Sequence, residues 1–229
     1  MTAVVSHGPK DYRLDEVDVP VPGSGEALVK VEAVGICASD LKCYHGAPKF
    51  WGDDTRPAWT QTLVVPGHEF VGRVVQVDDE GRRNWGVDVG DRVVSEQIVP
   101  CWTCFYCRRG EYWLCEPHDI YGFKRSTPGA MAPYMVFPAR ALVHQISEHL
   151  APAHAAFAEP LSCALHAVGL TPFGGHAVRR RVPSDGGRSF LPGSFVATVF
   201  AGARGCPGGA PAGPLGPRRY NLDASSTGA

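Results

Sequence analysis

In the segment CWTCFYCRRGEYWLC, at residues 101–115, four cysteines lie close together. Short C-x2-C turns aim pairs of sulfurs at one point, and zinc binds four thiolates at ~2.3 Å in a tetrahedron. No ligand position is left open, so the pattern predicts a structural zinc that stabilises a loop with little core of its own. Disulfides and an iron–sulfur cluster are the alternatives. The four residues are Cys101, Cys104, Cys107 and Cys115.

Composition excludes several classes of protein. The chain has 229 residues and a formal net charge of −1, so it lacks the basic surplus of proteins that bind nucleic acid or anionic membranes. No apolar run approaches the ~20 residues that span a bilayer, and the N-terminus MTAVVSHGPKDYRLDE has no signal-peptide pattern. We therefore expect a cytoplasmic protein, in which clustered cysteines more often bind metal than form disulfides.

The first part of the chain is rich in strand patterns. Apolar and polar residues alternate over 27–34 and 70–77, and Gly90-Asp91-Arg92 is a turn that leads into a strand at 93–95. Many short strands with turn signals predict a mainly β fold, either a small barrel or a sandwich. Two further short strands are expected at 134–136 and 141–143, followed by a helical segment over 152–168 that Pro160 should break or kink.

Three other segments carry residues that commonly bind metals. A lone cysteine is usually a small core residue, and each segment alone is weak evidence. Together they offer one thiol, one imidazole and one carboxylate, a ligand set that suits a zinc ion with an open fourth position. The segments are GICASDLKCYHG with Cys37, Ser39 and Asp40, PGHEFVGRVV with His68 and Glu69, and FAEPLSCALHAV with Glu159.

In combination with the four-cysteine segment, these motifs resemble those of a known family. VGICASDL (34–41), GHEFVGRV (67–74), VGDRV (89–93) and AEPLSCALHAV (158–168) are similar to the catalytic domain of zinc-dependent medium-chain alcohol and polyol dehydrogenases. The resemblance covers residues 1–168 and implies a GroES-like barrel. Glu159-Pro160 is typical of the sorbitol-type branch, and SEQIVPCWTC and DIYGFKR look closest to dehydrogenases of erythritol or threitol.

The resemblance implies a role for each matching residue. Cys37, His68 and Glu159 match the ligands of a catalytic zinc, and Glu69 matches a residue that binds this zinc directly or replaces a displaced ligand. Ser39 matches the hydroxyl that contacts the substrate oxygen and relays its proton, and Asp40 matches the carboxylate that orients the His68 ring. Lys42 stands where many relatives have a histidine that ends this relay.

The implied reaction oxidises a secondary alcohol of a small polyol, through a zinc alkoxide, by hydride transfer to NAD. The implied cofactors are two zinc ions per chain and NAD, and the family is usually homo-oligomeric. The remaining candidates have simpler interpretations: Cys43 and Cys163 as core or near-site thiols, His45 as a loop histidine, His166 as structural, and Phe50 and Trp51 as packing or pocket residues.

The composition changes after residue 168, where the chain becomes rich in Gly, Pro and Arg. No G-x-G-x-x-G motif occurs, so the sequence offers no residues for the Rossmann domain that binds NAD in this family. We expect residues 169–229 to be a disordered, low-complexity tail, which a shift of reading frame near Gly169 would produce. Three interpretations stay open: a polyol dehydrogenase, a zinc-binding fragment without turnover, and a zinc-ribbon interaction module.

Overall fold

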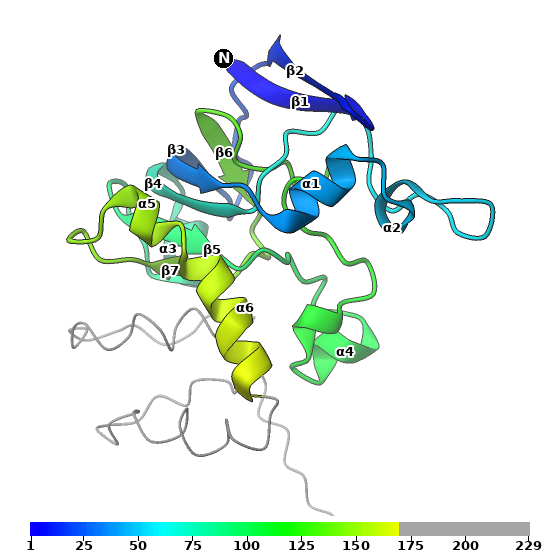
Figure 1. Ribbon diagram of the computed structural model, residues 1–229. Coiled ribbons are helices and arrows are strands. Elements are labelled where there is room, and N and C mark those ends of the chain that lie inside the picture. The colour runs from blue at the N-terminus through cyan, green and yellow to red at the C-terminus, as the bar shows by residue number, and fades with distance from the viewer. Residues whose placement is uncertain (170–229) are drawn as a thin grey trace, which may run out of the picture.

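The protein, described here from a computed structural model over residues 1–169, is built around one antiparallel sheet (Figure 1). The predictions of a disordered tail and of no Rossmann domain fall on residues 170–229 and lie outside the described residues. The five strands of the sheet follow the order β6-β3-β4-β5-β7. Their bounds are β3 Ala27–Gly35, β4 Glu69–Val77, β5 Arg92–Ser95, β6 Tyr134–Phe137 and β7 Val143–Gln145.

The alternating apolar residues of the central strands build the core. Val29 of β3 and Val74 of β4 pair across the sheet, and both are almost fully buried together with Phe137 of β6. Phe70 and Tyr121 belong to the same core cluster and pack edge to face, with their ring centroids 5.3 Å apart. Branched and aromatic side chains therefore fill the core. This packing holds the ends of β3 and β4 in place, from which the functional residues project.

The strand predictions are largely confirmed, and the chain is mainly β with short helices. The strands expected at 27–34, 70–77, 93–95 and 134–136 all form within a residue or two of those bounds. The last strand is an exception, because β7 begins at Val143 rather than at Ala141. The Ala141 amide instead closes a turn on the Pro138 carbonyl, which delays the start of the strand.

The helical segment over 152–168 is broken, as predicted, into α5 (Pro152–Ala155) and α6 (Ala158–Gly169). The break lies at residues 156–157 and not at Pro160 itself. Pro160 has no amide hydrogen, and its ring crowds the carbonyl four residues earlier, so the chain cannot be regular at Ala156. Pro160 then fits the first turn of α6, where a missing amide hydrogen costs little.

The remaining elements surround the sheet. A hairpin of β1 (Thr2–Gly8) and β2 (Asp11–Glu16) is joined to the rest of the domain by the Val4 amide, which donates to the Met131 carbonyl at 2.9 Å. The short helices are α1 Ala38–Tyr44, α2 Pro48–Trp51, α3 Asp79–Trp85, α4 Phe105–Arg108 and the 3₁₀ turn Tyr112–Leu114. Within residues 1–169, no helix has the length and apolar character needed to cross a membrane.

Candidate metal centre

Three predicted metal ligands meet where β3 ends and β4 begins. Gly35, the last residue of β3, pairs with Glu69, the first residue of β4. Cys37 follows two residues after Gly35 at the start of α1, and His68 directly precedes Glu69. The thiol, imidazole and carboxylate each offer one atom, and these atoms all lie within 4.8 Å of one another. Sheet pairing therefore brings together residues that are about thirty positions apart.

The His68 ring is held on both sides by residues of α1. Its Nε2 lies 3.2 Å from Ser39 Oγ, and its Nδ1 lies 3.6 Å from Asp40 Oδ1. The other oxygen of Asp40 accepts a hydrogen bond from the Cys37 amide at 2.9 Å, which fixes the carboxylate at the start of the helix. Burial raises the pKa of Asp40, and the nearby imidazole opposes this shift. Asp40 thus faces one ring nitrogen and leaves the other directed toward Ser39.

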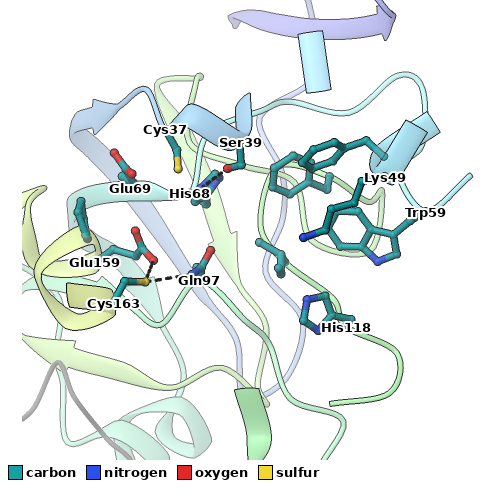
Figure 2. Close-up of a pocket in the computed structure, with 14 residues that line it drawn as sticks. Cys37, Ser39, Lys49, Trp59, His68, Glu69, Gln97, His118, Glu159 and Cys163 are labelled. Carbon is teal, nitrogen blue, oxygen red and sulfur yellow. Dashed lines mark hydrogen bonds between the residues drawn. The ribbon is translucent and has the colours of Figure 1, made fainter. Parts of the chain in front are cut away.

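These three residues line one end of a cavity of about 630 Å³, a normal size for a small-molecule pocket. Apolar side chains also line the cavity: Phe50, Ile120, Phe123 and Pro160. Figure 2 shows the polar residues in separate groups: Cys37, Ser39, His68 and Glu69 on one side, Glu159, Cys163 and Gln97 below them, and Lys49, Trp59 and His118 opposite.

Glu159 lines the same cavity but stands apart from the group formed by Cys37, His68 and Glu69. It lies in the first turn of α6 and is almost fully buried. Its Oε1 accepts a hydrogen bond from Cys163 Sγ at 3.0 Å, and Gln97 Nε2 approaches the same sulfur at 3.5 Å (Figure 2). Burial raises the pKa of Glu159, while the bond from Cys163 opposes that shift.

The donor set fits a zinc ion. Burial raises the pKa of the Cys37 thiol, so this sulfur needs a nearby positive charge to ionise. His68 Nδ1 and Asp40 Oδ1 are both buried and lack hydrogen-bond partners among the described residues, although they face each other. A bound cation at Nε2 would draw these two atoms together, because a metal-bound imidazole commonly donates its other ring hydrogen to a carboxylate.

The four cysteines of residues 101–115 also converge. Their sulfur atoms lie within 4.8 Å of one another, and all four are free thiols. Backbone amides donate to the sulfurs: Cys104 to Cys101 at 3.3 Å, and Cys101 to Cys115 at 3.3 Å. Burial opposes ionisation of Cys101, but hydrogen bonds from Thr103 and the Cys104 amide outweigh it and lower its pKa to about 6. This arrangement suits a metal with four sulfur ligands.

The segment that carries these cysteines, residues 101–115, is called the sulfur lobe below. It packs against two parts of the domain. Tyr112 donates to Glu96, which follows β5, at 3.3 Å, and the Trp113 ring meets the His166 ring of α6 at a centroid distance of 5.2 Å. The lobe therefore contacts the helix that carries Glu159 and Cys163.

The structure also places the other residues considered from sequence. Phe50 lines the cavity, whereas Trp51 donates to the Cys43 carbonyl at 2.7 Å and Cys43 is buried in the core. His45 contacts the Tyr44 ring, and Lys42 is exposed on α1 outside the cavity. Sequence reasoning missed Lys49, Trp59, Gln97 and His118, which reach the cavity from separate loops or short helices without a recognisable motif.

Comparison with known proteins agrees with this fold and site. Residues 23–148 match the alcohol dehydrogenase GroES-like domain, and the chain belongs to this family of zinc-dependent medium-chain dehydrogenases. The erythritol/L-threitol dehydrogenase of Mycolicibacterium smegmatis is 71% identical over 168 residues, which cover 73% of this chain and 46% of the relative. The L-threonine 3-dehydrogenase of Pyrococcus furiosus is 37% identical over 183 residues, which cover 78% of this chain and 48% of the relative.

A solved structure gives the same result. The 2R,3R-butanediol dehydrogenase of Bacillus subtilis is 32% identical, with a TM-score of 0.61 over 75% of this chain and 47% of that one. The chain thus spans about half the length of the curated relatives it matches. The predicted GroES-like fold and the family resemblance are confirmed, and the relatives are dehydrogenases of alcohols, polyols or an amino acid.

Proposed function

We propose that this chain forms the zinc-binding catalytic domain of a dehydrogenase that oxidises a secondary alcohol of a small polyol such as erythritol or threitol, with NAD as hydride acceptor. The observation that carries this proposal is the meeting of Cys37, His68 and Glu69 at one end of a partly apolar cavity. The 71% identity to an erythritol/L-threitol dehydrogenase supports the substrate class.

Cys37, His68 and Glu69 would hold the zinc, with Glu159 as a further carboxylate in the same cavity. When bound, zinc acts as a Lewis acid and lowers the pKa of a substrate hydroxyl. Ser39 Oγ lines the cavity beside His68, so it can accept a proton from a substrate hydroxyl and pass it on. Asp40 holds the His68 ring in the orientation that directs Nε2 toward this position.

The sulfur lobe has a different role in this proposal. Its four sulfurs offer a closed ligand set, so a second zinc would stabilise the lobe without contacting substrate. We therefore propose two zinc ions per chain, one in the cavity and one in the lobe.

The residues that would bind NAD are not identified by this proposal. The sequence contains no G-x-G-x-x-G motif, and among residues 1–169 the cavity offers only the residues proposed to bind zinc and the alcohol. A second candidate function is that of a zinc-binding chain that does not turn over. A zinc-ribbon interaction module explains the lobe but not the convergence of Cys37, His68 and Glu69.

The decisive test is an oxidation assay of the purified, zinc-loaded chain with erythritol, L-threitol and sorbitol, with NAD and NADP compared in parallel. Reduction of NAD with a tetritol supports the dehydrogenase, and a Ser39→Ala variant should then lose a factor of about 10²–10⁴ in kcat. Bound zinc without nucleotide binding or turnover supports the second candidate. A chain that binds no zinc in the cavity contradicts both.

A further inference from the structure

The cavity has a second polar wall that the proposed mechanism does not use. Lys49, Trp59 and His118 lie across the cavity from Cys37 and Glu69 (Figure 2). The two walls differ in charge, because both lining carboxylates, Glu69 and Glu159, lie away from Lys49. A ligand that reaches both walls must therefore offer polar groups at two separate points.

Lys49 is held at a defined position. It lies in α2, and the next residue, Phe50, is buried and stacks on Phe123 at a centroid distance of 5.3 Å. Trp51 anchors the other side of the helix through its bond to the Cys43 carbonyl. The backbone of Lys49 is thus fixed by packing, and its ammonium group extends toward the cavity (Figure 2).

The Lys49 ammonium group has no ion-pair partner among residues 1–169. Lys124 differs from Lys49, because it pairs with Asp119 at 3.2 Å and lies 5.6 Å from the centre of the Trp59 ring. An ammonium group offers three hydrogen-bond donors and no acceptor. Lys49 therefore presents unused donors to whatever occupies this side of the cavity.

We propose that Lys49 determines specificity by binding a terminal hydroxyl of a four-carbon polyol whose inner hydroxyl lies at the Cys37, His68 and Glu69 group. This inference rests on the proposed function and adds which part of the substrate is selected. A hydroxyl oxygen accepts a hydrogen bond from the charged ammonium, and such a bond contributes about tenfold or more in affinity. Simple secondary alcohols that lack the terminal hydroxyl cannot form this bond, so Lys49 does not increase their affinity.

The test compares two ligands that differ only at their ends. Erythritol and meso-butane-2,3-diol share four carbons and both inner hydroxyls, but the diol lacks the terminal hydroxyls. Binding of each to the zinc-loaded full chain is measured by ligand-observed NMR titration, which needs no turnover. The wild type should bind erythritol about tenfold or more tightly than the diol. Lys49→Met should weaken erythritol binding to the level of the diol and leave binding of the diol unchanged.

Lys30→Met is the matched control, because Lys30 is exposed on β3 and does not line the cavity. It should bind both ligands as the wild type does. If Lys49→Met fails to fold, Lys49→Gln repeats the test with a polar side chain that lacks the charge.

The possible failures are distinct. Equal affinity of the wild type for both ligands, or an equal loss for both in Lys49→Met, overturns the role of Lys49 and leaves the proposed function intact. Failure of the zinc-loaded wild type to bind either ligand overturns the proposed function, and the role of Lys49 falls with it.

Discussion

Glu69 lies directly opposite Gly35 across the β3–β4 ladder, and its carboxylate occupies the space where a larger residue would place its Cβ. A Cβ built on Gly35 would lie 2.6 Å from Glu69 Oε2 and 3.2 Å from Glu69 Cβ. The glycine therefore keeps this carboxylate beside Cys37 and His68.

Gly35→Ala should displace the Glu69 carboxylate and weaken zinc binding in the cavity, while the sulfur lobe keeps its metal. Competition with a chelator, followed by metal analysis, measures the two affinities separately. Gly169→Ala is the control, since a Cβ there meets nothing within 4 Å. An unchanged cavity affinity in Gly35→Ala would show that Glu69 does not contribute a ligand.

The two predicted zinc sites should be separable by single substitutions. The wild-type chain should contain about two zinc ions, and Cys104→Ser or Cys37→Ser should each reduce this to about one. Cys104→Ser should also lower the thermal stability, because a structural zinc contributes to folding. Mass spectrometry of metal content and thermal melting provide the measurements.

Cys163→Ser is the matched control for these variants, because it retains a donor for Glu159 and lies outside both ligand groups. It should retain both zinc ions. Loss of both metals from Cys37→Ser would contradict independent sites.

Local spacing predicts the four-cysteine group, whereas the family resemblance implies that Cys37, His68 and Glu159 act together. The structure places Glu69, and not Glu159, in one group with Cys37 and His68. Cys101 to Cys115 converge through turns of a few residues, and β3 with β4 brings Cys37 to His68 once the strands pair. The opposite wall is different, because Lys49 and His118 reach the cavity through the packing of separate loops. Their place depends on tertiary contacts such as the stacking of Phe50 on Phe123, which no local pattern encodes.

Stability should fall in mild acid because of His144. Burial lowers the pKa of His144 to about 4, below its ordinary value of 6.5, so the unfolded chain binds its proton more readily. The contribution of neutral His144 to the free energy of unfolding is fully present above pH 6.5. It is lost as the pH falls from 6.5 to about 4, and the free energy of unfolding then changes by up to about 1.4 kcal/mol per pH unit.

His144→Gln should flatten this part of the profile of unfolding free energy against pH, measured by urea denaturation. Glu96 is the nearby carboxylate, 3.9 Å from His144 Nε2, and a charged imidazole would face it. An identical slope in the variant would mean that other groups cause the acid sensitivity.

The core of the sheet should be sensitive to truncation at Phe137. This side chain is fully buried, and its ring centroid lies 5.5 Å from that of Phe70 and 6.1 Å from that of Tyr121. Phe137→Ala should therefore lower the free energy of unfolding by about 3–5 kcal/mol, measured by urea denaturation. Leu14→Ala, at a side chain that is 75% exposed, should change it by no more than about 0.5 kcal/mol. A small effect at Phe137 would contradict the packing described.

The contact between Trp113 and His166 joins the sulfur lobe to the helix that forms one wall of the cavity. Helix α6 carries His166 and also Glu159 and Cys163. The sulfur lobe therefore supports one wall of the cavity, although no residue of the lobe lines it. Loss of this contact would leave the wall with less support, so substitution of the distant cysteines should also alter the cavity.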